Sequence, residues 1–182
     1  MRKNFLLPLL CLLLLGGCAS LNPEKVKRKR YQEELKLTSS PVIIDYYAAE
    51  AIRPGDSWRI YLHAKDSDGD IKDIACVLEQ AGGSPYISVT RLKSTQGQEV
   101  AGYLLLRTPR DRDLMADLFT MKVTVVDIQG NSSEPIELPL QFGLEAKQKI
   151  PEKWEKVPER KLGTVGIRIE SSFLQEQRGC GC

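Results

Sequence analysis

The sequence predicts an all-β domain over residues 41–142, built as a sandwich of seven to eight short antiparallel strands. Three observations lead to this fold class. Short segments alternate apolar and polar residues with a period of two, turn-forming Gly, Pro and Asp residues separate them, and helical periodicity is missing from this range. A partly open barrel is the alternative arrangement of the same strands.

The clearest alternation lies in residues 58–65. One face carries apolar residues and the other carries polar or amphipathic ones, which is typical of a half-buried antiparallel strand. The apolar face consists of Trp58, Ile60, Leu62 and Ala64, and the other of Arg59, Tyr61, His63 and Lys65. Similar patterns predict strands at residues 42–47, 74–78, 86–93, 100–107, 119–125 and 136–142. Pro139 favours an edge position for the last strand, because proline has no N–H to donate.

Residues 1–17 have the order of parts of a bacterial signal peptide. Arg2 and Lys3 come first, an apolar segment of 11 residues occupies positions 5–15, and small residues follow. The segment is too short for a transmembrane helix, which needs about 20 apolar residues. The segment ends in Leu15-Gly16-Gly17-Cys18, which resembles the lipobox of bacterial lipoproteins at all four positions.

The resemblance to lipoproteins implies that a signal peptidase recognises Leu15, Gly16 and Gly17. The mature chain would then begin at Cys18, with acyl chains such as palmitate attached, and two or three such chains hold a protein at a membrane essentially permanently. The alternative is an ordinary secretory signal in which Cys18 has no role. In lipoproteins of bacteria with two membranes, an alanine such as Ala19 implies release to the outer membrane. We therefore expect a lipid-anchored protein of the cell envelope, on the periplasmic or surface face of the outer membrane.

The charges of the chain argue against nucleic-acid binding. The sequence has 26 Lys and Arg and 24 Asp and Glu residues, and loss of residues 1–17 removes Arg2 and Lys3, which leaves a net charge of zero. A nucleic-acid-binding domain would carry a basic surface. The lipidated tether, residues 18–40, is basic and contains a helix-start signature at residues 22–24. Its cations could rest on anionic headgroups, or only keep a solvated linker extended.

Two segments resemble bacterial immunoglobulin-like surface domains. Residues 123–133, with Asp127, Gly130 and Asn131, are similar to the penultimate strand and last turn of such domains, and residues 64–71 are similar to the turn after the second strand. The resemblance covers residues 41–142 and implies an immunoglobulin-like β-sandwich. Such a fold does not by itself specify a function.

Asp66, Asp68 and Asp70 form the most suggestive group for chemistry in the sequence. Alternate carboxylates on a turn direct hard oxygen ligands to one side, as calcium prefers, and Asp127 could join them from another loop. The segment is not an EF-hand, because the glycine and the bidentate glutamate that such a loop needs are missing from the corresponding positions. The alternative is that aspartate and glycine simply form a good turn.

No catalytic arrangement is visible in the sequence. The single histidine, His63, lies on the outward face of a predicted strand, whereas a catalytic triad or a zinc site normally needs more than that. Phosphate-binding glycine loops and dinucleotide motifs are missing as well. We expect a protein that is not an enzyme and that has no cofactor besides its covalent lipid, with calcium as the one candidate addition.

Residues 143–182 form an irregular C-terminal extension. Trp154 is expected to anchor it to a surface, and the alternation in residues 162–170 predicts one further strand, which packs on its own domain or offers an edge to a partner. The chain ends in Cys180 and Cys182, separated by one glycine. In an oxidising envelope this pair could form a disulfide, bridge to another chain or bind a soft metal, or remain inert. Cys76 lies on an inward face and is expected to be a buried apolar residue.

Two functions agree with these observations. The first is a non-catalytic, lipid-anchored envelope lipoprotein whose immunoglobulin-like domain binds a protein partner, as an accessory subunit of an outer-membrane assembly. The second is a calcium- or glycan-binding cell-surface module centred on Asp66, Asp68 and Asp70. Sandwiches that bind sugars usually expose aromatic residues along one sheet, and here the tyrosines are scattered along the sequence (Tyr46, Tyr47, Tyr61 and Tyr103).

Overall fold

The computed structural model describes residues 24, 25, 27, 28, 30, 39–93, 98–155 and 160–172. The chain divides into two compact units, Met1–Lys36 and Leu37–Cys182. In the first unit the described residues are helical, in agreement with the helix-start signature at residues 22–24. The second unit contains the β-domain. Among the described residues, no helix combines the length and the apolar character that crossing a membrane requires.

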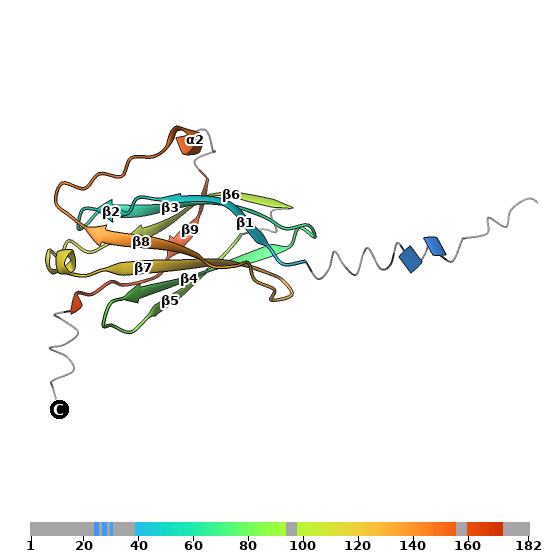
Figure 1. Ribbon diagram of the computed structural model, residues 1–182, viewed down its shortest axis with the longest axis horizontal. Helices are drawn as coiled ribbons and strands as arrows, with labels where there is room; N and C mark the ends of the chain where they lie inside the picture. The colour runs from blue at the N-terminus through green and yellow to red at the C-terminus, as the bar shows by residue number, and fades with distance from the viewer. Residues whose placement is uncertain are drawn as a thin grey trace, which may run out of the picture. The chain divides into compact units, whose positions relative to one another are not determined.

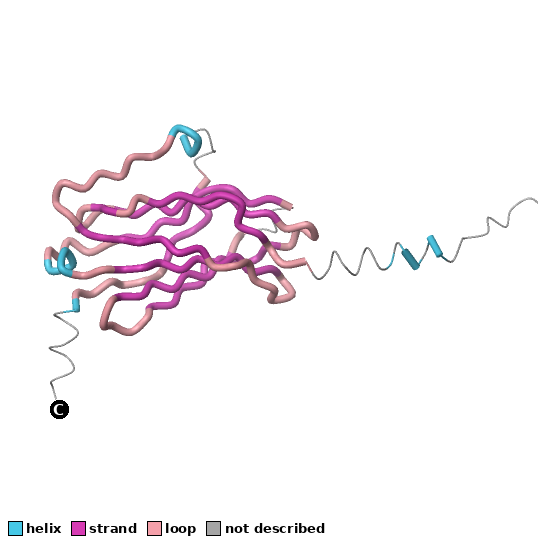
Figure 2. Tube along the Cα trace, in the orientation of Figure 1, coloured by secondary structure: helices cyan, strands magenta, loops and turns pink. Residues whose placement is uncertain are grey.

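Within the described residues, nine strands form two sheets that pack face to face (Figure 1; Figure 2). The strands are β1 (Val42–Ala48), β2 (Ala51–Ile52), β3 (Ser57–Lys65), β4 (Ile71–Gln80), β5 (Tyr86–Arg91), β6 (Glu99–Arg107), β7 (Phe119–Asp127), β8 (Ile136–Phe142) and β9 (Lys161–Val165). The first sheet has the order β1-β3-β6-β9, and the second has the order β2-β8-β7-β4-β5. The predicted all-β sandwich is confirmed.

The strand order is that of an immunoglobulin-like sandwich. β1, β3 and β6 take the places of strands A, B and E in one sheet, and β8, β7, β4 and β5 take those of G, F, C and C′ in the other. The place beside β6 is filled by β9, which comes from the C-terminal extension and runs parallel to β6. β2 also pairs in parallel, with the end of β8. Both sheets are therefore mixed, whereas the sequence predicts antiparallel pairing throughout.

The parallel pair of β2 and β8 follows from a change of sheet. β1 and β2 belong to one extended segment, which leaves the first sheet at Ala49 and joins the second. The buried indole Nε1 of Trp58 donates a hydrogen bond of 2.7 Å to the carbonyl oxygen of Ala49, and this bond fixes the crossing. β2 pairs only with the last two residues of β8, so β8 is an edge strand at Pro139, as expected.

The core between the sheets follows the predicted inward faces. Trp58, Ile60, Leu62 and Ala64 of β3 are fully buried. The inward residues of β4 and β7 pack with them (Ile74, Cys76, Leu78, Met121, Val123 and Val125). Each large side chain that leaves water in this way contributes about 1.5–3 kcal/mol, so these rows hold the two sheets together.

The C-terminal extension packs on the outer face of the first sheet. Residues 144–155, which we call the strap, lead from β8 to the short helix α2 (Glu152–Glu155), as Figure 1 shows. Trp154 in α2 is 3% exposed and packs on Tyr61, which confirms the prediction that it anchors the extension. Tyr61 is only 7% exposed as a result, although the alternation of β3 places it on the outward face.

The last strand is shorter than predicted. β9 ends at Val165, but Ile167 and Ile169 beyond it remain buried, so the apolar alternation in residues 162–170 reflects packing and only partly pairing. β9 closes one side of the sandwich against β5. The hydroxyl of Thr90 donates to the carbonyl oxygen of Thr164, at 3.3 Å. The predicted strand therefore packs on its own domain.

Candidate metal centre and tyrosine groove

Three aspartates meet at one end of the sandwich, where two turns lie side by side. Asp66 directly follows β3, Asp70 directly precedes β4, and Asp127 is the last residue of β7. β4 and β7 pair in antiparallel orientation with Ile71 opposite Asp127, so the start of one strand adjoins the end of the other. One carboxylate oxygen from each aspartate lies within 4.8 Å of the other two.

Asp127 is held in place by its own turn. Its carboxylate accepts hydrogen bonds from the backbone N–H of Asn131 at 2.8 Å and from the side-chain amide of Asn131 at 2.7 Å. Gly130 has a φ of 91°, a left-handed conformation that glycine adopts without strain. This turn thus fixes the side chain of Asp127, a residue that is 2% exposed.

Asp66 is 3% exposed, and only one of its oxygens is paired. Oδ1 accepts a hydrogen bond of 3.0 Å from the hydroxyl of Ser39. Oδ2 is buried and has no hydrogen-bond partner in the described part of the chain, and the same holds for both oxygens of Asp68 and for Oδ1 of Asp70. Buried polar atoms normally find a partner, so this turn contains more acceptors than donors.

Burial and the neighbouring carboxylates raise the pKa of Asp66 to about 7. Burial is the largest cause, followed by the hydrogen bonds that a protonated Asp66 would share with Asp68 and Asp70. Repulsion from the charge of Asp68 adds to the rise, whereas the bond from Ser39 lowers the pKa of Asp66. A cation among these groups would favour the ionised form, because it would remove the repulsion.

The structure brings the predicted calcium ligands together. Asp66, Asp70 and Asp127 form the cluster, and Asp68 lies in the same turn, between Asp66 and Asp70 in the sequence. Gly69 has a φ of 77°, so the same segment also uses the turn chemistry that was the alternative interpretation. The side chains of these aspartates offer only carboxylate oxygens, which are hard ligands and suit calcium and magnesium better than softer metals.

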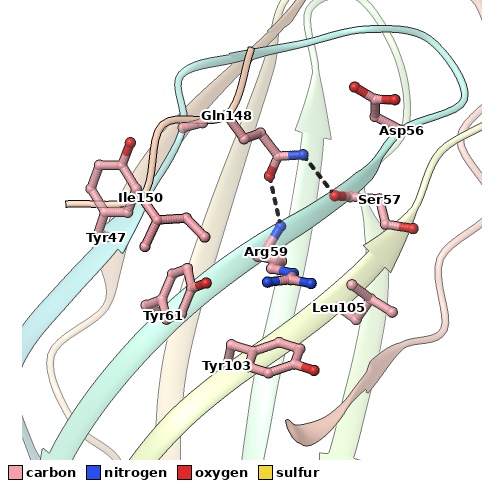
Figure 3. Close-up of a pocket in the computed structure, with 10 residues that line it drawn as sticks. Tyr47, Asp56, Ser57, Arg59, Tyr61, Tyr103, Leu105, Gln148 and Ile150 are labelled. Atoms are coloured by element: carbon pink, nitrogen blue, oxygen red, sulfur yellow. Dashed lines mark hydrogen bonds between the residues drawn. The ribbon is translucent and has the colours of Figure 1, made fainter. Parts of the chain in front are cut away.

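A groove of about 480 Å³ lies between the strap and the outer face of the first sheet (Figure 3). Residues of β1, β3 and β6 form its floor, and Gln148 and Ile150 of the strap form a wall. The side-chain amide of Gln148 accepts a hydrogen bond of 3.1 Å from the N–H of Arg59 and donates one of 2.8 Å to the carbonyl oxygen of Ser57. The amide of Gln148 therefore bonds to β3 as the peptide group of a neighbouring strand would.

Three tyrosines form one row across the floor of the groove. Tyr47 lies opposite Tyr61, and Tyr61 lies opposite Tyr103, in the register of β1, β3 and β6. Their ring centroids are 6.4 and 5.9 Å apart. The hydroxyl of Tyr47 donates to the carbonyl oxygen of Lys149 in the strap. Sequence reasoning missed this row, because each tyrosine lies at an outward position but the register between the strands is not visible in the sequence.

Arg59 lies beside the tyrosine row, two residues before Tyr61 on β3. Its guanidinium carbon is 5.3 Å from the ring centroid of Tyr103, a distance at which a cation is attracted to an aromatic face. Figure 3 shows the Arg59 side chain between Gln148 and Tyr103. The groove thus combines aromatic faces with polar side chains.

The other predicted residues either lie outside the described part of the chain or, where they are described, take no part in either site. The lipobox and the terminal cysteines lie outside the described residues (Leu15, Gly16, Gly17, Cys18, Cys180 and Cys182). His63 bonds to Glu99 on an outer face, and this bond is the main reason why the pKa of Glu99 is lowered. Cys76 is fully buried, which raises the pKa of its thiol to about 12 and makes it the inert core residue that was predicted.

Comparison with known proteins assigns this chain to no family. No protein-family model matches it, and no curated protein matches it either.

Proposed function

We propose that this protein is a non-catalytic, lipid-anchored envelope protein whose β-sandwich binds a calcium ion at Asp66, Asp70 and Asp127, with Asp68 beside them. The observation that carries this proposal is the Oδ2 atom of Asp66, which is buried without a hydrogen-bond partner within a cluster of carboxylates. None of the four aspartates forms an ion pair with a described Lys or Arg. An uncompensated buried charge costs several kcal/mol, and a divalent cation would offset that cost.

Calcium fits this cluster better than other cations. It accepts six to eight oxygen ligands in variable geometry, whereas magnesium demands a near-ideal octahedron with shorter distances. Zinc and copper prefer nitrogen and sulfur ligands, and the described cluster offers carboxylates. Backbone carbonyl oxygens and water would complete the coordination.

Calorimetric titration of the purified, metal-free protein with calcium chloride tests the site. We expect one ion per chain and a melting temperature that rises once calcium exceeds its Kd, because the ion binds the folded state. The substitutions Asp66→Asn and Asp127→Asn should remove both effects. Asp113→Asn, which alters an exposed aspartate, should leave them unchanged. A melting temperature that does not respond to millimolar calcium contradicts the proposal.

The membrane anchor is a separate part of the proposal and is supported by the lipobox, Leu15-Gly16-Gly17-Cys18. We expect cells fed with labelled palmitate to incorporate the label into the protein, which should then sediment with membranes. Cys18→Ser should abolish the label and release the protein. Label that persists in this variant would contradict lipidation of Cys18.

Binding of a protein partner is a second candidate function. The observation that favours it is β5, an edge strand whose outward Ile87 and Val89 are 71% and 60% exposed. An edge with exposed apolar residues can pair with a strand of another protein. A photocrosslinking residue in place of Val89 should capture such a partner in cells. The same residue in place of Leu118, which is 57% exposed and lies outside the strands, is the control, and equal capture at both positions would count against this function.

A further inference from the structure

We propose that the groove under the strap binds a neutral saccharide, with Tyr103 as its main stacking surface. The proposal concerns a different site from the aspartate cluster and does not depend on calcium. It rests on three features of the groove: the row of aromatic rings, the polar side chains around it, and the way in which Gln148 occupies the edge of β3.

The tyrosine row offers the surface on which a sugar ring packs. A pyranose ring presents a face of C–H bonds, which lies favourably against the negative face of an aromatic ring. The ring planes of Tyr47 and Tyr61 are tilted by 37°, and those of Tyr61 and Tyr103 by 51°, so the three rings do not share one plane. Trp154 covers Tyr61, which leaves the half-buried Tyr47 and Tyr103 on either side of it as the accessible rings.

Polar groups beside the tyrosine row can form hydrogen bonds with the hydroxyl groups of a sugar. Ser57, Asp56 and Gln148 line the groove together with Arg59, so donors and acceptors face the same space, as hydroxyl groups require. The negative charge of Asp56 is already compensated by Arg53, because the Nε atom of Arg53 lies 3.2 Å from the carboxylate of Asp56. A ligand without net charge suits such a site, and the volume of the groove falls within the range of about 300–1,000 Å³ for small-molecule sites.

The edge of β3 argues against an extended peptide as the occupant. A peptide that pairs with a strand gains its affinity from main-chain hydrogen bonds. At this edge the N–H of Arg59 and the carbonyl oxygen of Ser57 are already bonded to Gln148. The last residue of β1 that pairs with β3 is Ala48, so the amide of Gln148 stands where the next partner strand would run. A sugar needs only side chains and does not compete with this amide.

Titration calorimetry with three neutral probes tests the proposal: cellotetraose, maltotetraose and chitotetraose. We expect at least one to bind the full protein, and Tyr103→Ala to weaken that binding about tenfold through loss of the stacking face and its hydroxyl. Tyr46→Ala is the matched control, because Tyr46 is a neighbouring exposed tyrosine that is not part of the groove lining. Asp66→Asn and added salt should leave the affinity unchanged.

Several outcomes would overturn the saccharide site. One is a failure of all three probes to bind at millimolar concentration, provided that the thermal melt shows a folded protein. Another is an equal loss of affinity in Tyr103→Ala and Tyr46→Ala. Loss of binding in Asp66→Asn would place the sugar at the aspartate cluster and would also overturn it. The calcium titration of the unliganded protein is independent of each of these results.

Discussion

Trp154 of the strap lies against Tyr61 of β3, with ring centroids 5.4 Å apart and ring planes at 36°. The neighbouring ion pair between Lys153 and Asp45, at 2.8 Å, is exposed and is worth at most about 1 kcal/mol. Burial of an aromatic side chain is worth several times more. This aromatic contact therefore contributes more to holding the strap than the ion pair does.

Trp154→Ala is expected to lower the free energy of unfolding by roughly 3 kcal/mol, because it removes a buried aromatic side chain. Trp154→Phe should cost much less, since the indole Nε1 of Trp154 is buried without a hydrogen-bond partner among the described residues and its loss carries no penalty of its own. Lys153→Ala should cost under about 1 kcal/mol. Urea unfolding of the three variants checks this order, and equal stabilities of the Ala and Phe variants would contradict it.

The pKa of Asp66 makes the stability of the metal-free protein depend on pH. This pKa is raised from 3.8 to about 7 by folding, so the folded state favours the protonated carboxyl. The associated stability is fully present below about pH 3.8 and is lost as the pH rises through about 7. Without metal, the melting temperature should therefore fall between pH 5 and pH 8 by more in the wild type than in Asp66→Asn. Calcium should reduce the fall, and an identical pH dependence in both proteins would refute the assignment.

Asn131 positions a proposed calcium ligand without being a ligand itself. Asn131→Ala removes the side-chain bond to Asp127 and should lower calcium affinity about 10–100-fold, as loss of an outer-shell partner commonly does. Ser132→Ala, at an exposed position in the same turn, is the control. Calorimetric titration of both variants separates an effect on the ligand from a general effect on the turn. Unchanged affinity in Asn131→Ala would mean that Asp127 does not coordinate the ion.

Gly163 allows β9 to approach β5 closely. A Cβ atom at this position would lie 2.1 Å from Cγ2 of Thr90, so Gly163→Ala should destabilise the protein by about 1–3 kcal/mol through overpacking. Thr90→Ser removes that methyl group and keeps the hydroxyl that bonds to Thr164. The double variant Gly163→Ala, Thr90→Ser should therefore recover most of the loss in a thermal melt. Additive destabilisation by the two substitutions would show that the clash is relieved elsewhere.

Local patterns were sufficient to predict every described strand except the two-residue β2, the inward faces of the strands and the aspartate cluster. Alternation of apolar residues identifies which side of β3, β4 and β7 enters the core, because side chains on a strand alternate between faces. Asp66, Asp70 and Asp127 could be grouped because each lies at the border between a strand and a turn. Such turns meet when the strands pair in antiparallel orientation.

The tyrosine row, the strap and the parallel strand β9 depend on contacts between distant segments. The burial of Tyr61 comes from Trp154, whose place on the sheet no local pattern specifies. Likewise, the alternation in residues 162–170 indicates an extended apolar segment but not its partner or its direction. Register between strands is set by packing and turn geometry across the whole domain, so the groove became visible only in three dimensions.

The parallel pairing of β9 with β6 has a consequence for the order of folding. Leu104 pairs with Gly163, so the first sheet stays incomplete until the C-terminal extension has returned across the domain. Contacts between segments this far apart form slowly, because the intervening chain must first be closed into a loop. During that interval β6 is an open edge, on which another chain could add a strand. Changes in β9 should therefore lower the yield of refolding, through aggregation, in addition to any effect on the stability of the finished domain.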